Sequence, residues 1–203
     1  MSDAPSVPER ARPSEAMTED EIRASTVGEP TRIDGGIVLA AYDPEWPRLY
    51  AREAATIRAA LGDRIVSLDH IGSTAVPGIC AKPIIDIQLL VRDSGDEASY
   101  ADALEAAGYT LRIREPEWEE HRVFKGQNPD VNLHVFSPGS RAAERHLRFR
   151  DALRASDAER DRYAAVKRDL AAQSWAYVQQ YADAKNAVID EILARAGVTI
   201  PRG

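Results

Sequence analysis

Cysteine is almost absent from this chain, since Cys80 is the only one among 203 residues. A single thiol cannot form an internal disulfide, which argues against the small domains that disulfides hold together. No apolar run approaches the roughly 20 residues of a membrane-spanning helix. The N-terminus also lacks the basic start and apolar stretch of a signal peptide. We therefore expect a cytoplasmic protein that does not enter a membrane.

An excess of positive charge is also lacking, because 33 acidic residues outnumber 26 basic ones and the net charge is −7. Proteins that bind long nucleic acids usually present a basic face. The balance therefore argues against a long nucleic-acid groove, but it leaves room for a small basic pocket. No Gly-x-x-x-x-Gly-Lys-Ser/Thr run is present either, which argues against a kinase of the P-loop type.

The composition divides the chain into a leader, one domain and a tail. Residues 1–36 contain four prolines and few large apolar residues, so they predict a disordered leader. Thr18 to Glu21 has the pattern of a helix start, but the surrounding composition does not favour a helix. Hydrophobic residues make up 44% of the chain, which is enough for a packed core, so we predict a single domain at residues 37–198. Residues 199–203 are predicted to form a tail.

Hydrophobic periodicity predicts strands and helices first and a helical C-terminal third. The Asp43-Pro44 pair is typical of a helix start, and Gly62 of a helix end. The predicted strands are 37–41, 65–68, 83–91, 109–113, a short one at 123, and 131–136, and the predicted helices are 44–61, 95–107, 140–154, 157–172 and 174–196. This order predicts an α+β fold, with helices packed over a mixed α/β sheet.

The clearest functional signal is the segment His70-Ile71-Gly72-Ser73-Thr74-Ala75-Val76-Pro77-Gly78 between two predicted strands. Gly72 permits a positive φ or a close approach of the backbone. Successive N–H groups, together with the hydroxyls of Ser73 and Thr74, form a cradle for phosphate oxygens. A tight turn that binds no ligand is the alternative interpretation.

Two charged residues just after this loop favour the phosphate site. Lys82 brings a positive charge near the loop, and Asp86 stands inside the apolar run Ile84-Ile85-Asp86-Ile87. Burying an unpaired carboxylate is costly. The negative charge of Asp86 must therefore be balanced by a lysine or a metal ion, or be exposed in a cleft at the strand end.

Five segments together resemble the GrpB family over roughly residues 37–196. They are Tyr42-Asp43-Pro44-Glu45-Trp46-Pro47, His70 to Gly78, Ala81-Lys82-Pro83-Ile84-Ile85-Asp86-Ile87, Phe149-Arg150-Asp151-Ala152-Leu153-Arg154 and Tyr181-Ala182-Asp183-Ala184-Lys185. This family is assigned to the nucleotidyltransferase superfamily with a polymerase β-like fold. The resemblance therefore implies a nucleotidyltransferase-like mixed sheet. In some actinobacterial proteins a similar domain is fused to dephospho-coenzyme A kinase.

The resemblance also implies a metal site. The superfamily pattern is a Gly-Ser turn, then Asp-x-Asp on a strand and a third carboxylate on a later strand, and the aspartates hold Mg²⁺. Gly72-Ser73 matches the turn, and Asp86 matches the first carboxylate, as a catalytic residue and metal ligand. Gln88 replaces the second carboxylate and is a weaker ligand for Mg²⁺. His134 lies near the expected third position, where it acts in proton transfer, binds phosphate, or is a core histidine.

Three further cations are candidates for binding phosphate. Arg122 alternates with apolar residues on a predicted strand, Arg150 borders an apolar helix stripe, and Lys185 points from the packing face of its helix. A salt bridge to Asp151 is the alternative for Arg150, and outward snorkelling is the alternative for Lys185. The glutamates around Trp118 are typical of a solvated surface, unless one of them replaces a missing metal ligand.

The sequence thus predicts a protein that binds a nucleotide or another phosphorylated small molecule. In the first interpretation it transfers a nucleotidyl group from an NTP to a small-molecule acceptor, or activates that acceptor, with Mg²⁺. In the second interpretation it is a non-catalytic module that binds a nucleotide or coenzyme A-like ligand and regulates or scaffolds a partner. Gln88 in place of a carboxylate favours the second interpretation, so enzymatic activity stays open, as do the acceptor, the base and the oligomeric state.

Overall fold

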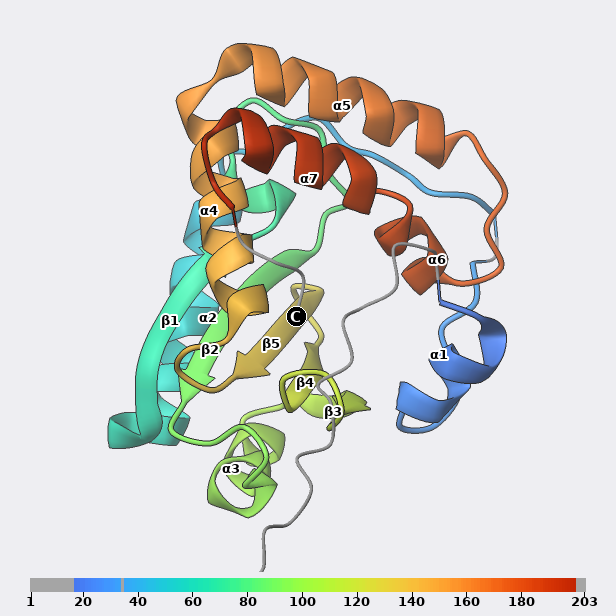
Figure 1. The fold of residues 1–203 in the computed structure, drawn as a ribbon. Coiled ribbons are helices and arrows are strands. Elements are labelled where there is room, and N and C mark those ends of the chain that lie inside the picture. Colours follow the sequence, from blue (N-terminus) through green and yellow to red (C-terminus); the bar gives the residue numbers. More distant parts are fainter. Residues whose placement is uncertain (1–16, 34, 200–203) are drawn as a thin grey trace, which may run out of the picture.

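A computed structural model describes residues 17–33 and 35–199 and contains one five-stranded mixed sheet. In Figure 1, α2 (Trp46–Leu61) lies behind the sheet and α4 (Arg141–Ala155) in front of it. This arrangement confirms the expected α+β fold. The part of the predicted leader before residue 17 and the part of the predicted tail after residue 199 lie outside the described residues. Within the described part of the chain, no helix combines the length and apolarity needed to span a lipid bilayer.

The sheet has the strand order β1-β2-β5-β4-β3. Its strands are β1 (Ile65–Ile71), β2 (Ile85–Val91), β3 (Thr110–Glu115), β4 (His121–Gly126) and β5 (Val131–Phe136). Strands β2 and β5 run parallel, and the register pairs Asp86 with Asn132 and Gln88 with His134. Because side chains alternate between the two faces of a strand, these four polar side chains share one face.

The opposite face of the sheet carries the apolar core. The fully buried residues Ile87 and Leu89 of β2 lie beside Leu133 and Val135 of β5. Helix α2 and the short α3 (Ala101–Ala106) cover this face. The helix predicted at 95–107 forms only as a 3-10 turn, Glu97–Ser99, followed by α3. Each buried aliphatic side chain contributes about 1.5–3 kcal/mol. This face therefore holds the fold together, and the other face is available for polar side chains.

The C-terminal third is helical, as predicted, but it is divided differently. Helices α4 and α5 (Asp157–Ala171) match two predicted helices, and the hydroxyls of Ser140 and Ser156 cap them. The single helix expected at 174–196 is wrong. The structure has α6 (Val178–Asp183) and α7 (Asn186–Arg195), with a break at Ala184 and Lys185. Neither residue is Gly or Pro, so periodicity alone carried no sign of the break.

Two predictions at the start of the domain are wrong. Residues 37–41 form no strand, and only Ala40 makes an isolated antiparallel bridge, to Ala81. Helix α2 begins at Trp46 rather than at 44. Asp43 does not cap the helix, since its carboxylate accepts a hydrogen bond from the N–H of Glu45 at 2.8 Å. The Asp-Pro pair thus builds a turn that precedes the helix.

Residues 17–33 are not a disordered leader. Helix α1 (Glu19–Ser25) begins with a capping box, in which the Thr18 hydroxyl accepts from the N–H of Glu21 and the Glu21 carboxylate accepts from the N–H of Thr18. Ile22 of this helix is only 4% exposed. The helix-start pattern therefore outweighs the polar composition, because Ile22 finds a surface to pack against.

The segment after α1 connects the sheet to the C-terminal helices. The N–H of Val27 donates to the carbonyl of Arg112 on β3 at 2.8 Å, and the N–H of Ile33 donates to the carbonyl of Ala176 at 3.1 Å. Figure 1 shows α1 on the side of the molecule where α6 lies. Residues 17–33 therefore join two parts of the domain that are far apart in the sequence.

Candidate functional site

The turn after β1 packs directly against Asp86. Gly72 has φ +68°, and a Cβ atom at this position would lie 2.3 Å from Oδ2 of Asp86. Gly72 therefore needs both a positive φ and the absence of a Cβ atom. The group that its backbone approaches is the carboxylate of Asp86, and not a ligand as expected. From the paired position on β5, the Asn132 side-chain amide donates to Oδ1 of Asp86 at 2.7 Å. The turn and a neighbouring strand therefore fix this carboxylate from two sides.

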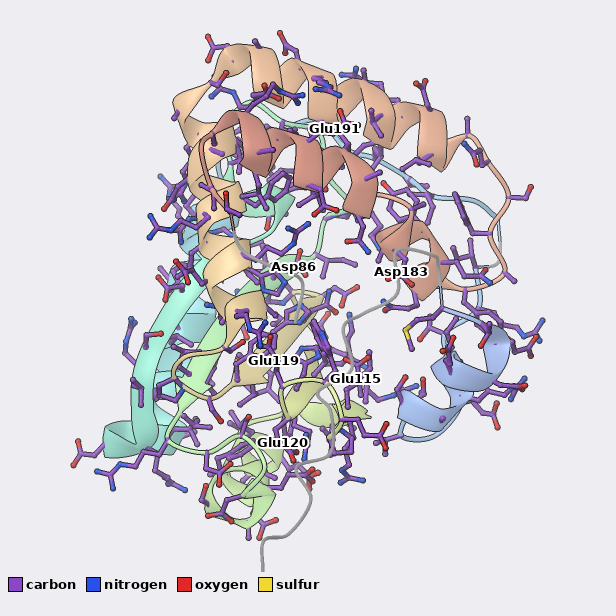
Figure 2. All side chains as sticks on the ribbon, viewed as in Figure 1. Asp86, Glu115, Glu119, Glu120, Asp183 and Glu191 are labelled. Atoms are coloured by element: carbon purple, nitrogen blue, oxygen red, sulfur yellow. The ribbon has the colours of Figure 1, made fainter. Side chains whose placement is uncertain are left out.

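Three lysines from three different segments surround Asp86. Lys82 precedes β2, Lys167 lies on α5, and Lys185 lies at the break between α6 and α7. The negative charge of Asp86 raises the pKa of each of these lysines, against the effect of burial. In Figure 2, Asp86 lies below α7, between the sheet and the C-terminal helices. One carboxylate thus faces three ammonium groups.

Lys167 ties the turn to α5. Its side chain is 3% exposed, and its Nζ donates to Oγ of Ser73 at 2.8 Å and to the carbonyl of Cys80 at 2.5 Å. The hydroxyl of Ser73 is therefore placed beside the cation cluster by contacts from the helix.

Lys82 and Lys185 share one aromatic neighbour. Their Nζ atoms lie 5.5 Å and 4.6 Å from the centre of the Tyr181 ring. Such cation–π contacts attract an ammonium group but do not neutralise it. Within the described part of the chain, neither group has a carboxylate within 4.0 Å. Neither ammonium group therefore forms an ion pair with a described carboxylate.

Crowding and burial shift the pKa values of these groups. Burial, followed by repulsion from Lys82 and Lys167, lowers the pKa of Lys185 to about 7. Burial lowers the pKa of Lys167 to about 8 and also lowers that of Lys82. Burial raises the pKa of Asp86, against the hydrogen bond from Asn132 and the charges of the lysines. A polyanion near these groups would stabilise the charged form of every lysine.

The composition of the chain makes this cluster unusual. Of its 26 basic residues, only four are lysines, Lys82, Lys125, Lys167 and Lys185, and the other 22 are arginines. The charge of the fourth lysine, Lys125 of β4, lowers the pKa of Asp86. Its Nζ donates a hydrogen bond to the side chain of Asn132 at 2.8 Å. Every lysine of the chain therefore lies around the same carboxylate.

Several predicted residues face other partners. The Thr74 hydroxyl is buried, donates to the carbonyl of Ile84 at 3.2 Å, and lies 3.1 Å from Nε2 of His70. This hydroxyl holds the loop closed. Thr74 is therefore not part of the group around Asp86. The structure does bring together the other predicted residues of this region, Gly72, Ser73, Lys82 and Lys185, at Asp86.

The two predicted arginines also have partners elsewhere. Arg122 is 4% exposed, and its Nε donates to Glu97 at 2.5 Å. Arg150 donates to Asp151 at 2.8 Å and to the carbonyl of His70 at 3.1 Å. The structure thus shows the salt bridge that was the alternative for Arg150. Both guanidinium groups have structural roles.

His134 lies on the same sheet face as Asp86. Strands β2 and β5 are adjacent, and His134 stands two positions beyond Asn132, the partner of Asp86. Nδ1 of His134 lies 3.1 Å from Nε2 of His121. The neighbouring Gln88 is fully buried and contacts Nδ1 of His146 through Oε1 at 3.1 Å. A histidine is therefore present on the sheet face that carries the carboxylate.

The donor set does not fit a resident Mg²⁺ ion. Among the described residues, no group of three or more His, Cys, Asp or Glu side chains is placed to hold a metal. Gln88 and Asn132 stand where further carboxylates would be needed, and lysines face Asp86. Because Mg²⁺ is commonly held by one or two carboxylates together with phosphates of the substrate, a metal here would have to arrive with the ligand.

Sequence reasoning missed Lys167 and Asn132. Lys167 has apolar residues three and four positions away on both sides, which is the signal that singled out Lys185. Asn132 stands two positions before His134, so strand alternation places both on one face. The scarcity of lysine is a third signal, because it draws attention to each of the four positions at once.

The fold and site define an α+β protein with a cluster of lysines around one carboxylate, where the loop after the first strand meets the second. The family model described as GrpB protein matches residues 36–195. The chain therefore belongs to the GrpB family, as its sequence indicated.

Similar proteins agree with this assignment. A UPF0157 protein of Halalkalibacterium halodurans is 55% identical over 186 residues, which cover 92% of this chain and 95% of that protein. The crystal structure of the conserved protein GrpB from Enterococcus faecalis has a TM-score of 0.67 and 28% identity over 78% of this chain and 96% of that one. A dephospho-CoA kinase of Mycolicibacterium paratuberculosis is 29% identical over 78% of this chain, which is 45% of the kinase.

The contact between Gly72 and Asp86 predicts that Gly72→Ala will destabilise the protein more than Gly78→Ala. Both glycines belong to the same loop and have positive φ, but a Cβ at Gly78 meets nothing within 4 Å. Gly78→Ala should cost about 1–2 kcal/mol of backbone strain. Gly72→Ala should cost about 1–3 kcal/mol more, because Asp86 must move. Urea unfolding measures both losses, and equal losses would contradict the contact.

The lowered lysine pKa values predict how stability depends on pH. An unfolded lysine has a pKa near 10.5, so above about pH 7 the folded protein binds fewer protons than the unfolded chain. The free energy of unfolding of the ligand-free protein should therefore rise between about pH 7 and pH 9. Lys185→Met should reduce this rise by up to about 1.4 kcal/mol per pH unit, the limit for one proton.

The matched control for this measurement is Arg148→Met, which removes a positive charge from a side chain that is 58% exposed. It should leave the slope unchanged. A Lys185→Met variant with the same slope as the wild type would show that Lys185 titrates as an ordinary surface lysine.

Proposed function

We propose that the site around Asp86 binds the polyphosphate of a nucleotide or of another phosphorylated small molecule. The observation that carries this proposal is the gathering of all four lysines of the chain around one carboxylate. An ammonium group is a compact charge that binds phosphate and changes its pKa readily. Arginine, which supplies every other basic side chain of the protein, stays charged even where burial lowers its pKa. The use of lysine is therefore suited to a site whose charge responds to its ligand.

The balance of charge supports a ligand with several negative charges. Three ammonium groups face the carboxylate of Asp86, and burial together with their mutual repulsion lowers the pKa of Lys185. A di- or triphosphate carries enough negative charge to offset this repulsion. The Ser73 hydroxyl, held by Lys167 at 2.8 Å, adds a polar group on the side of the turn.

The small extent of the cluster supports a small ligand. The cations belong to one compact group, and the chain as a whole has a net charge of −7. A long nucleic acid would be repelled beyond this group, whereas a nucleotide needs only the group itself. Any Mg²⁺ would enter with the phosphates, because the described residues around Asp86 offer no group of three metal ligands.

Two forms of this proposal differ in what happens after binding. His134 lies on the same face as Asp86 and favours an enzyme that transfers a nucleotidyl group to a small-molecule acceptor. The amides of Gln88 and Asn132 in place of carboxylates favour a non-catalytic module. The similarity to 45% of a dephospho-CoA kinase supports a coenzyme A-like ligand for the module, since that ligand offers the same phosphate chemistry.

Calorimetric titration with ATP and with inorganic tripolyphosphate tests the binding site. Lys82→Ala, Lys167→Ala and Lys185→Ala should each weaken binding roughly 10–100-fold, the range for one charge-assisted hydrogen bond. Arg148→Ala, at an exposed position on α4, is the matched control and should bind like the wild type. Binding at pH 8 should take up about one proton, because the ligand raises lysine pKa values that lie at about 7 and 8.

Comparing buffers of different ionisation enthalpy measures this proton uptake. A polyphosphate that binds with no proton uptake, or equally well to all three lysine variants, would contradict the proposed site. Binding of ATP but not of tripolyphosphate would show that the base, rather than the phosphates, is recognised.

Release of pyrophosphate from an NTP in the presence of hydroxyl-bearing metabolites distinguishes the enzyme from the module. In the enzyme, Asp86→Asn should reduce release at least about 100-fold, as expected when a charge that organises the reacting phosphates is lost. Thr74→Ser, which keeps the buried hydroxyl on the other side of the loop, is the control. Saturable binding without pyrophosphate from any NTP, with Mg²⁺ or Mn²⁺ present, would establish the module instead.

A further inference from the structure

A cavity of about 510 Å³ lies beside the end of β1, and His70 is one of the residues that line it. His70 pairs with Ile87 across the antiparallel strands β1 and β2. Paired side chains share one face of a sheet, and Ile87 belongs to the face that α2 covers. The cavity therefore lies against the α2 face of the sheet, whereas Asp86 and the lysine cluster lie on the opposite face.

Ring-bearing side chains form the walls of this cavity. They are Tyr42, Pro47, Tyr50, His70 and Pro77. The Tyr50 and His70 rings stack with their centres 4.7 Å apart, and the Tyr50 hydroxyl donates to the carbonyl of Leu68 at 3.0 Å. The Tyr42 ring meets Trp46 edge-on at 5.4 Å. Rings that the protein already holds in place offer a preformed surface to another flat ring.

Two arginines add positive charge to the same cavity. Nε and Nη2 of Arg154, near the end of α4, donate to the carbonyl of Ala75 at 3.0 Å and 2.8 Å. Nη1 of Arg160 on α5 donates to the carbonyls of Leu153 and Arg154 in the last turn of α4, at 2.9 Å and 3.1 Å. Carbonyl partners fix the position of a guanidinium group but leave its charge in place.

The carboxylates that pair with these arginines point to solvent. Asp151 lies 3.9 Å from Arg154 and is 56% exposed, and Asp157, which pairs with Arg160, is 89% exposed. Exposed ion pairs of this kind are weak. Among the described residues that line the cavity, none is acidic. His70 is neutral near pH 7, because burial, followed by the charge of Arg154, lowers its pKa to about 4. The charge of the cavity therefore comes from its two arginines.

We propose that this cavity is a second ligand site, which binds a small aromatic anion. The flat ring of the ligand packs against Tyr42, Tyr50 and His70, and its acidic group binds the guanidinium groups of Arg154 and Arg160. The planar N–H groups of arginine suit a carboxylate or a phosphate. Cavities that hold small molecules measure roughly 300–1,000 Å³ and combine apolar walls with a few polar groups. This site is independent of the polyphosphate proposed for the lysine cluster.

Titration with benzoate, followed by NMR of the histidine rings, tests the site. The chain has four histidines, and His121, His134 and His146 contact one another on the other face of the sheet. Benzoate should therefore shift the ring signals of His70 and leave those of the other three unchanged. A ligand of this size should bind with a Kd on the order of 1 mM.

Two analogues of benzoate separate the contributions of the ring and the charge. Benzamide keeps the flat ring but has no charge, and cyclohexanecarboxylate keeps the charge but has no flat ring. Each should bind at least roughly 3-fold more weakly than benzoate, because each loses one of the two kinds of contact. Phenyl phosphate, titrated in parallel, shows whether the acidic group is preferred as a phosphate or as a carboxylate. Equal affinities of benzamide and benzoate would contradict the role of the arginines.

Two variants of the cavity should weaken the binding of benzoate. Arg160→Met removes a charge, and Tyr42→Leu removes a ring, so each should raise the Kd at least roughly 3-fold. Tyr42→Leu keeps both arginines and their carbonyl partners, and it tests the site even if Arg160→Met fails to fold. Arg148→Met is the matched control, since Arg148 lies on α4 outside the cavity lining and is 58% exposed. It should bind benzoate like the wild type.

The two proposals fail in different ways. If benzoate leaves the His70 signals unchanged at concentrations far above 1 mM, the aromatic site is wrong and the lysine site is untouched. Competition between tripolyphosphate and benzoate would also overturn the aromatic site, because it would place benzoate at the lysine cluster. Failure of tripolyphosphate and ATP to bind the wild type would overturn the proposed function and leave the aromatic site intact.

Discussion

The contact between the backbone of Gly72 and the carboxylate of Asp86 is the constraint on which the rest of the site depends. Only a residue without Cβ lets the turn approach Asp86 so closely, and this approach brings Ser73 within reach of Lys167. The carboxylate also offsets part of the repulsion among the lysines, as its effect on the pKa of Lys185 shows. The geometry of the turn and the charge of the cluster therefore follow from one packing contact.

The parts of the site that were predictable lie close together in the sequence or carry a pattern of their own. Gly72, Ser73, Lys82 and Asp86 fall within one loop and strand, so the order of residue types was enough. Thr74 looked equally suitable, but its hydroxyl direction depends on the carbonyl of Ile84, which only the folded loop supplies. Long-range contacts such as the one between Lys167 and Ser73 arise from helix packing, and short-range patterns do not encode them.

The fold was predicted where periodicity and packing agree. Strand β5 was found at its observed bounds and α5 within a residue, because their apolar residues recur with one clear period. Helix α1 was missed because composition was weighed above the capping box at Thr18, while the burial of Ile22 depends on a surface formed much later in the chain. The break at Ala184 and Lys185 was missed because no helix-breaking residue marks it and the apolar period continues across it.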